Sequence, residues 1–370
     1  MFLKSLTSRV SSRSLKVPLR LVFLVPLVLQ ISAAVGLTGW LSFRNGQKAV
    51  NDLAANLSLE VTGRTKEHFQ SFADVSHLFL EMNAAAIRAG NLDPADFPNL
   101  ERYFWHQTYV SDRVTTIYYA SVSGKFLLVK REDPPLVYIR DESTNFLRNI
   151  YRLDNEGNPI ELIKTDSYEP RTRPWYTTAV RSRKSIWSPI YQFTALPVLG
   201  ITPAVPIYSK VGELQGVLAI DLTLEQISDF LRSLKIGKSG QAFIIERNGE
   251  IVANSTAELP FIKTVNGQKR LLATSSNNLL IRSAAESLQQ NFGNLDGIQR
   301  PAHLNFKVGS KRQFLTVAPL SDGRGLDWLM VVVIPESDFM EGIDANTRIT
   351  FLLCLAALVV AIALSIFTSR

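Results

Sequence analysis

Two long uncharged segments, one near each end of the chain, constrain its fold more than any other feature. They are Leu21–Phe43, with 23 residues, and Ile349–Phe367, with 19 residues. Each is close to the roughly 20 apolar residues that an α-helix needs to cross a hydrocarbon core of about 30 Å. We therefore predict two transmembrane helices, at residues 21–43 and 349–367, with a separately folded segment between them.

The positive charge of the chain is concentrated outside this middle segment. The sequence carries 40 basic and 33 acidic residues, a net charge of +7. Six basic residues and no acidic ones lie in the two tails: Lys4, Arg9, Arg13, Lys16, Arg20 and Arg370. Residues 44–348 are therefore nearly neutral, which argues against nucleic-acid binding. By the positive-inside rule, residues 1–20 form a cytoplasmic basic tail, and residues 44–348 are extracytoplasmic. We expect a two-pass membrane protein with residues 44–348 outside the cytoplasm.

Each uncharged segment has an alternative interpretation. The first could be a cleaved signal peptide, since Ile31–Ala34 is small enough for a peptidase, but it is about twice as long as a typical signal-peptide core. The second could be a buried core helix, although its place at the chain end favours the membrane. Its Cys354 is the only cysteine, which excludes a disulfide framework. We expect Cys354 to be a small apolar filler.

Residues 44–110 are predicted to form stalk helices. Apolar residues recur at intervals of three and four through 47–90, and Gly90-Asn91 followed by Asp93-Pro94 is a stop signal. A helix of about 44 residues would be about 65 Å long. Such a helix can run along two modules or serve as a dimer stalk, and we expect a parallel homodimer along it. A shorter helix is predicted at about 94–109.

After residue 110 the pattern changes to antiparallel strands. Turn signals at Ser123-Gly124, Asn155–Asn158 and Asn248-Gly249 separate predicted strand pairs. Another pair, Ile201–Ser209 and Leu214–Thr223, precedes a helix predicted at 224–234.

Two parts of the segment repeat the same order of motifs. Val205-Pro206, a glycine-containing turn, a strand and Ser-Asp-Phe at 228–230 form the first set. Ala318-Pro319, a similar turn, a strand and Ser-Asp-Phe at 337–339 form the second. A chance similarity of two hairpins is the alternative, but the shared order favours a duplicated α+β module.

Motifs of known catalytic chemistry do not occur in the sequence. It contains no HExxH, GxSxG, P-loop or GxGxxG pattern, and its four histidines are scattered. We therefore predict no catalytic residue, no metal site and no cofactor. Any kinase or cyclase activity would lie in a C-terminal output domain absent from this chain.

One short stretch has the composition of a binding site for a small anion. Tyr168, Arg173, Trp175 and Tyr176 lie within nine residues, and Tyr191 follows. An arginine can hold a carboxylate through two parallel hydrogen bonds, and Trp and Tyr offer apolar walls with polar tips. Pro174 suits the first turn of a helix that would run to about Ser182. The alternative is that the aromatic residues belong to the core and the arginine to the surface.

The same stretch carries a resemblance to a known family. Arg-Pro-Trp-Tyr at 173–176, Trp-Ser-Pro-Ile-Tyr at 187–191, Gly-Ile-Thr at 200–202 with Pro206, and the strand 216–221 resemble double Cache (dCache) sensor domains. These are the extracytoplasmic ligand-binding parts of bacterial chemoreceptors, sensor histidine kinases and nucleotide cyclases. The resemblance covers about residues 45–340.

What the resemblance implies is an α+β fold. A long N-terminal helix would carry two stacked PAS-like antiparallel-sheet modules, flanked by the two transmembrane helices. We assign residues 111–235 to the membrane-distal, ligand-binding module and 236–340 to the membrane-proximal module.

A subset of that family binds amino acids through a Tyr, Arg, Trp, Tyr, Tyr, Asp, Asp pattern. The residues that match it are Tyr168, Arg173, Trp175, Tyr176, Tyr191 and, as the last aspartate, Asp221. Phe193 stands where the subset has an aspartate that helps to hold the ligand ammonium. The carboxylate half of the site is therefore retained and the amine half is altered. A ring attracts a methylated ammonium best, so betaine-like ligands should be preferred over ordinary amino acids. Asp221 has an alternative role as a strand-end residue that shapes the turn before 224.

These observations predict a membrane-anchored extracytoplasmic sensor. It would bind a small carboxylate-bearing ligand, amino-acid-like or betaine-like, in the distal module. The signal would pass through residues 335–348 and the second transmembrane helix to a cytoplasmic output domain or partner. The other partners expected are membrane lipid and a second copy of the chain. Two alternatives lack signalling: a membrane-tethered capture module for small molecules, and a structural envelope protein.

Overall fold

The computed structural model describes residues 19–194, 198–264, 267–340 and scattered residues between 349 and 367. The predictions for the basic tail, for Cys354, for residues 341–348 and for a continuous helix at 349–367 therefore fall outside the described residues. The chain divides into two compact units, Met1–Leu53 with Phe339–Arg370, and Ala54–Asp338. Among the described residues, no helix has both the length and the apolar character required of a membrane span.

The first helix, α1, is longer than the sequence indicated. It runs without a break from Leu19 to Ala89, so the two helices expected at 21–43 and 47–90 are one. Gly46 lies at the expected junction, but a glycine costs a helix only about 1 kcal/mol relative to alanine, too little to end it. The expected stop is confirmed: Gly90 has a φ of 81°, the left-handed conformation that terminates helices.

The second helix, α2 (Phe97–Val110), begins three residues later than predicted. The side chain of Asp96 accepts a hydrogen bond from the backbone N–H of Asn99 at 3.2 Å and so caps the helix start. Pro98 then occupies the first turn, where its missing N–H costs nothing.

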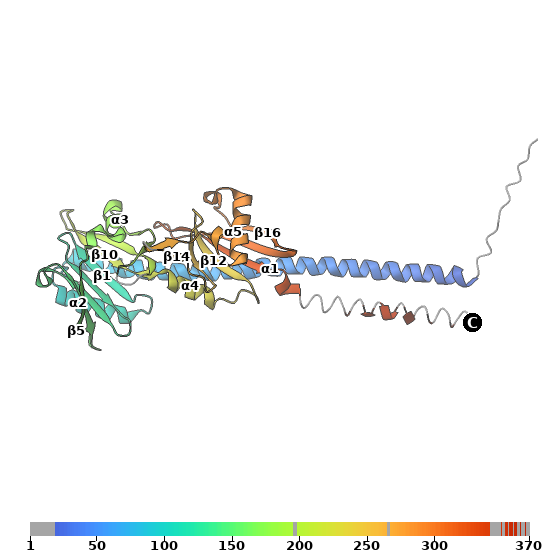
Figure 1. Cartoon of the computed structure of the whole chain (residues 1–370), viewed down its shortest axis with the longest axis horizontal. Coiled ribbons are helices and arrows are strands. Elements are labelled where there is room, and N and C mark those ends of the chain that lie inside the picture. Colours follow the sequence, from blue (N-terminus) through green and yellow to red (C-terminus); the bar gives the residue numbers. More distant parts are fainter. Residues whose placement is uncertain are drawn as a thin grey trace, which may run out of the picture. The chain divides into compact units, whose positions relative to one another are not determined.

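The first module is built on an antiparallel sheet with eight strands in the described residues. Their order is β5-β4-β3-β2-β1-β10-β9-β6 (Figure 1). The strands are β1 Thr116–Ser121, β2 Phe126–Lys130, β3 Leu136–Arg140, β4 Arg148–Leu153, β5 Pro159–Asp166, β6 Ile186–Trp187, β9 Pro203–Tyr208 and β10 Leu214–Ile220. β3 was not predicted.

Both faces of this sheet are buried at its centre, which the alternation along β1 illustrates, whereas the edge strand β5 is largely exposed. Ile117 and Tyr119 pack into a core with residues of α1 and α2, including Leu100. Tyr118 and Ala120 point to the opposite face and pack with Trp175 of α3 (Pro174–Ser182). The sheet therefore separates the long helices on one face from the α3 segment on the other.

Two predicted strands are broken, and the breaks lie next to each other. The strand expected at 201–209 is divided at Thr202 into β8 (Leu199–Ile201) and β9. The strand expected at 214–223 is divided at Asp221 into β10 and β11 (Leu222–Thr223). β8 and β11 leave the main sheet and form a small sheet with β7 (Tyr191–Gln192), in the order β11-β8-β7. Thr202 and Asp221 bond to each other at the break, as described below, which gives the physical reason for it.

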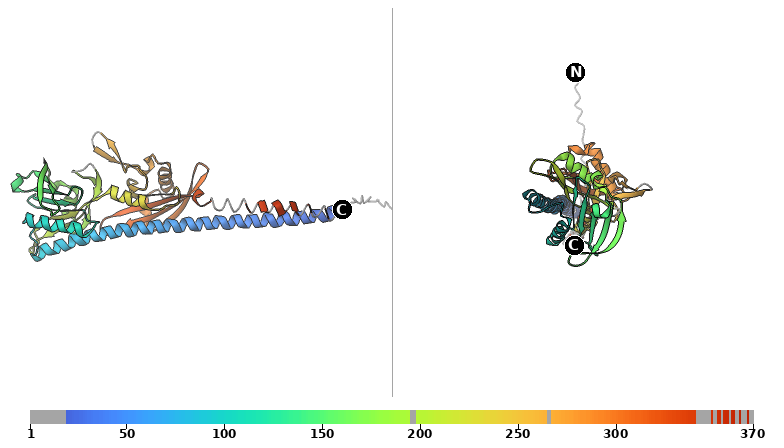
Figure 2. Two further views of the ribbon diagram at one scale, coloured as in Figure 1. Left: turned by 90° about the horizontal axis from the view of Figure 1, so that it is seen from below. Right: turned by 90° about the vertical axis from the view of Figure 1, so that its left-hand side faces the viewer.

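The second module follows α4 (Leu224–Ser233), and both modules lie beside α1 (Figure 2). Its sheet has the order β13-β12-β18-β17-β16. The strands and helix are β12 Gln241–Glu246, β13 Ile251–Asn254, β16 Ala302–Val308, β17 Lys311–Ser321, β18 Asp327–Pro335 and α5 Leu279–Phe292, with a separate hairpin of β14 Phe261–Thr264 and β15 Gly267–Arg270. In this sheet the hairpin β13–β12 is followed by the last strand, β18, and then by the strand before it, β17. The first module has the same arrangement, with the hairpin β2–β1 followed by β10 and then β9. The shared order agrees with the duplication expected from the repeated motif.

Candidate ligand-binding site

The α3 segment is positioned by its local sequence. Glu169 accepts a hydrogen bond from the N–H of Arg171 and begins a 3₁₀ turn, η2 (Pro170–Thr172). Arg173 is both the last residue of that turn and the N-cap of α3, and Pro174 fixes φ for the first helical residue. The helix occupies Pro174–Ser182, as predicted. Its first turn directs Trp175 into the core beneath the main sheet.

Six of the seven residues predicted for the site line one cavity of about 40 Å³, which we call the small cavity. They come from the α3 segment, from β7 with the residue after it, and from the break between β10 and β11. The residues that the sequence predicted and that line it are Tyr168, Arg173, Trp175, Tyr191, Phe193 and Asp221. The residues that line it but were not predicted are Tyr118, Phe126, Leu128, Tyr138, Arg148 and Thr194.

Tyr176 is the predicted residue that lies outside this lining. Its side chain is buried in the core beside Trp175, with the two ring centroids 5.5 Å apart. Because successive residues of a helix project about 100° apart, Trp175 and Tyr176 cannot both face the same small cavity from one turn.

Arg173 presents a guanidinium group with little protein bonding. Its Nη2 donates to the backbone carbonyl of Gln192 at 3.1 Å, and its Cζ lies 5.7 Å from the centroid of the Tyr191 ring. No carboxylate forms an ion pair with Arg173 within the described residues. A guanidinium has five N–H donors, so most of them are available to a ligand in the small cavity.

Asp221 is held by hydroxyl groups. Its Oδ1 accepts hydrogen bonds from the Tyr118 hydroxyl at 2.6 Å and from Thr202 Oγ1 at 2.8 Å. The Tyr191 hydroxyl lies 2.9 Å from the same threonine oxygen. Burial raises the pKa of Asp221 to about 6, although these hydrogen bonds act in the opposite direction. Both protein hydrogen bonds that Asp221 makes within the described residues fall on Oδ1, so Oδ2 is left to the cavities that Asp221 lines.

Arg148 stabilises one wall of the small cavity. Its Nε and Nη2 donate to the two carboxylate oxygens of Asp166 at 2.8 and 2.7 Å, and its Cζ lies 4.3 Å from the Tyr168 ring centroid. Burial alone would raise the pKa of Asp166, but hydrogen bonds from Arg148 and Lys164 lower it. The charge of Arg148 is thus already neutralised by Asp166. Arg148 therefore orients Tyr168 and does not offer a free cation to a ligand. No sequence motif marks it, because its partner is 18 residues away across the β4–β5 pair.

Phe193 lies against the small sheet because residue 200 is a glycine. A Cβ at Gly200 would be 2.2 Å from the Phe193 ring and 2.6 Å from the carbonyl oxygen of Leu222. The ring therefore occupies space that any other residue at 200 would fill. In this position Phe193 also packs edge-on against Tyr191, with centroids 5.1 Å apart.

A second, larger cavity of about 270 Å³ adjoins the first, and we call it the large cavity. The two share the lining residues Leu128, Tyr138, Phe193 and Asp221. The large cavity is completed by Thr115, Thr116, Lys130, Val198, Thr223 and Gln226. The sequence analysis assigned none of these six residues to a site.

Comparison with known proteins gives one family match. A family model described as Cache domain matches residues 125–343, more than half of the chain. Methyl-accepting chemotaxis protein McpA of Pseudomonas putida is 36% identical over 88 residues, which are 24% of this chain and 14% of that protein. Adenylate cyclase 1 of Rhizobium meliloti is 27% identical over 209 residues, 53% of this chain and 29% of that protein. The chain thus spans less than a third of either curated relative.

Two solved structures share the fold. The ligand-binding domain of the Pseudomonas fluorescens chemoreceptor CtaA in complex with L-isoleucine has a TM-score of 0.51 at 17% identity, covering 80% of this chain and 97% of that chain. The extracellular domain of histidine kinase mmHK1S-Z3 has a TM-score of 0.51 at 15% identity, covering 79% and 98%. At such identities the likeness concerns the fold alone.

Proposed function

This chain belongs to the Cache domain family, and from that premise we propose that it is the input region of a membrane-anchored extracytoplasmic sensor. The ligand would be a small carboxylate-bearing molecule bound in the first module. Relatives that support a sensory role include a chemotaxis receptor and an adenylate cyclase, which couple similar segments to different outputs.

The observation that carries the proposal is the charge arrangement of the two adjoining cavities. Arg173 stands at one side without a carboxylate partner in the described residues, and Asp221 stands at the other with Oδ2 free of protein hydrogen bonds. The remaining arginine of the small cavity is neutralised by Asp166. A zwitterion with its carboxylate at Arg173 and its cation at Asp221 would give both groups charge-assisted hydrogen bonds or ion pairs.

The type of cation follows from Phe193. Where an aspartate would accept N–H bonds from a primary ammonium, Phe193 and Tyr138 offer ring faces beside Asp221. Ring faces attract cations by about 0.5–2 kcal/mol and suit a methylated ammonium, which has few or no N–H bonds to satisfy. We therefore expect betaine-like ligands to bind better than ordinary α-amino acids, and Phe193→Asp to shift the preference towards amino acids. The CtaA domain was solved with L-isoleucine, so that amino acid is the natural reference ligand.

The anchoring and assembly of the chain also remain proposals. The lengths of the two uncharged segments and the basic tails support two membrane passes with residues 44–348 outside. A homodimer along α1 is supported by large apolar side chains that stay exposed on that helix, Leu59, Leu78 and Met82. Other apolar residues of the same helix, Val61, Phe69 and Phe72, are buried within this chain and so are not available for a dimer contact. The signal would leave towards a cytoplasmic output domain or partner.

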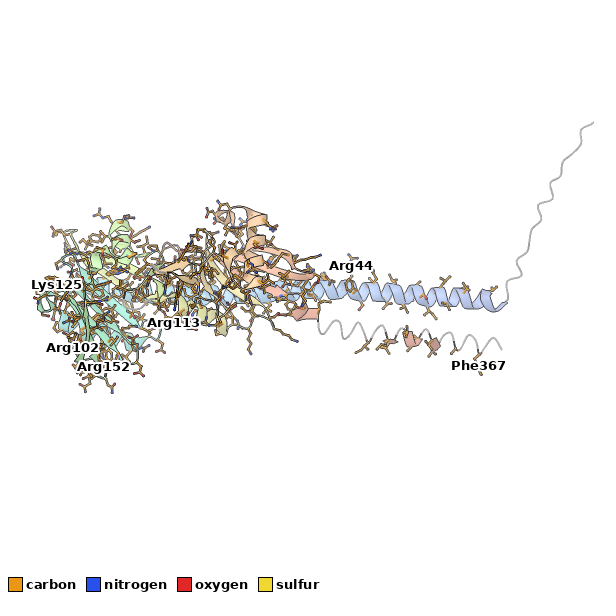
Figure 3. The ribbon with its side chains drawn as sticks, in the orientation of Figure 1. Arg44, Arg102, Arg113, Lys125, Arg152 and Phe367 are labelled. Atoms are coloured by element: carbon orange, nitrogen blue, oxygen red, sulfur yellow. The ribbon has the colours of Figure 1, made fainter. Side chains whose placement is uncertain are left out.

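The test is isothermal titration calorimetry of the whole chain in detergent with glycine betaine, acetate and L-isoleucine. We expect glycine betaine to bind, and Arg173→Ala to weaken it about 10- to 150-fold, the worth of a charge-assisted hydrogen bond of about 1.5–3 kcal/mol. Arg152→Ala is the matched control, because Arg152 pairs with Glu161 on an exposed part of the same module (Figure 3). Equal losses in both variants, or no binding by any of the three compounds, would argue against the proposal.

A further inference from the structure

The size of the small cavity limits what part of a ligand it can hold. A volume of about 40 Å³ corresponds to about three water-sized groups, which is the scale of one carboxylate. If the carboxylate lies at Arg173, as proposed above, the rest of the ligand must extend past the shared wall of Phe193 and Asp221. The space available there is the large cavity, with about 270 Å³.

The wall of the large cavity has an apolar part and a polar part. Leu128, Phe193 and Val198 supply apolar surface. Thr116 and Lys130 supply polar groups, and they are directly paired residues on β1 and β2, so their side chains stand next to each other on one face of the sheet. Leu128 lies two residues before Lys130 and therefore on the same face. A ligand arm that extends from Asp221 across β1 towards β2 would reach Thr116 and then Lys130.

The polar groups at this end have unused hydrogen-bonding capacity. The ammonium of Lys130 forms an ion pair with Glu132, which uses one of its three N–H donors. Thr116 is buried, with 6% of its surface exposed, and its hydroxyl has no hydrogen-bond partner among the described residues. This hydroxyl can therefore donate a hydrogen bond to an acceptor in the large cavity.

We propose that the large cavity selects ligands by the end of their side arm, and that Lys130 and Thr116 together bind a carboxamide or carboxylate oxygen there. This inference rests on the proposed function and extends it to a ligand class: a zwitterion with a linear arm that ends in a hydrogen-bond acceptor. An arm with an apolar end leaves the donors of Lys130 and Thr116 without a partner and binds more weakly.

The experiment compares two ligands that differ at the end of the arm. They are the N-trimethyl derivatives of L-glutamine and L-norleucine, titrated calorimetrically into the whole chain in detergent. We expect the glutamine derivative to bind at least about 10-fold more tightly. Lys130→Met keeps the aliphatic stem and should abolish this preference while leaving the norleucine derivative within about threefold. Lys130→Arg should retain much of the preference. The unmethylated amino acids form a second pair, independent of the expectation about Phe193.

Lys125→Met is the control variant. Lys125 also lies beside β2 and is also paired with a glutamate, Glu142, at 2.9 Å, but it belongs to the turn between β1 and β2 (Figure 3). It should leave the preference unchanged. A preference that survives in Lys130→Met, or that is absent from the unaltered chain, overturns the inference. If Arg173→Ala weakens the binding of both ligands, but the unaltered chain binds the two equally tightly, only this inference fails. If neither binds, the proposed function fails with it.

Discussion

If the proposed ligand places its cation at Asp221, its binding should depend on pH. Burial raises its pKa to about 6, so the carboxyl group is protonated and neutral in a growing fraction of molecules below that pH. The affinity for glycine betaine should therefore fall as the pH is lowered from about 7.5 to 5, and Asp221→Asn should give a weaker but flatter profile. Calorimetric titrations at several pH values would measure both. A profile that is equally steep in Asp221→Asn would assign the dependence to another group.

The same pKa shift has a predictable sign in stability. A carboxyl group whose pKa is raised by folding binds its proton more tightly in the folded state than in the unfolded one. Its contribution to the free energy of unfolding is greatest below the ordinary aspartate pKa of 3.8 and declines as the pH rises to about 6. Ionising the buried Asp221 therefore costs stability, and the hydrogen bonds from Tyr118 and Thr202 reduce that cost. This is consistent with a buried carboxylate kept for binding.

At the residue scale, the sequence predicted the part of the site that lies in short, chemically distinctive runs. Arg173 and Trp175 are two residues apart, so their proximity follows from their spacing. Tyr118, Tyr138 and Lys130 lie on three strands and reach the cavities only because those strands pair in one register. The register of paired strands depends on long-range packing. A single sequence therefore does not show that these tyrosines line a cavity, because they are equally suited to a core.

At the scale of elements, the small sheet formed by β7, β8 and β11 fixes the position of Phe193. Gly200→Ala would place a methyl group 2.2 Å from the Phe193 ring and 2.6 Å from the backbone oxygen of Leu222. We expect a loss of about 1–3 kcal/mol in the free energy of unfolding, the usual cost of overpacking. Removing the ring in Gly200→Ala/Phe193→Ala should recover only part of it, because the contact with the Leu222 backbone remains. Thermal unfolding of the unaltered chain and the two variants would measure this.

Gly63→Ala provides the comparison for that experiment. A Cβ at Gly63 has no atom within 4 Å and lies in the middle of α1. It should therefore stabilise the protein by up to about 1 kcal/mol through helix propensity alone. If Gly200→Ala were as harmless as Gly63→Ala, the close approach of Phe193 to β8 would be wrong.

The elements were predicted well where one strong local signal sets a boundary. Pro174 begins α3 and Gly90 follows the end of α1, because proline and glycine have backbone conformations that few other residues share. The breaks at Thr202 and Asp221 were missed, because both stretches have the apolar composition of continuous strands. What divides them is the hydrogen bond between the two side chains, a tertiary contact that their spacing of 19 residues does not reveal.

For the whole molecule, the repeated motif predicted two modules but not how they contact each other within Ala54–Asp338. The indole N–H of Trp187, on β6, donates to the carboxylate of Asp322 in the turn between β17 and β18. The Trp187 ring also packs near Phe69 of α1, which in turn contacts Trp328 of β18. The second module therefore contacts Trp187 of the first module. The next residue, Ser188, donates its backbone N–H to the carbonyl of Thr202.

This contact gives a route for a ligand signal, and it can be tested by hydrogen–deuterium exchange on the whole chain. Ligand binding at Asp221 acts on Thr202, which is bonded to Ser188, and Trp187 passes the change to Asp322 and so to β18. We expect glycine betaine to alter exchange in β18 (Asp327–Pro335) of the unaltered chain, and Asp322→Ala to remove most of that effect while affinity stays within about threefold. Asp327→Ala is the control, since it removes an ion pair with Arg247 that lies wholly inside the second module. If β18 responds to ligand in Asp322→Ala as it does in Asp327→Ala, the signal does not depend on the hydrogen bond between Trp187 and Asp322.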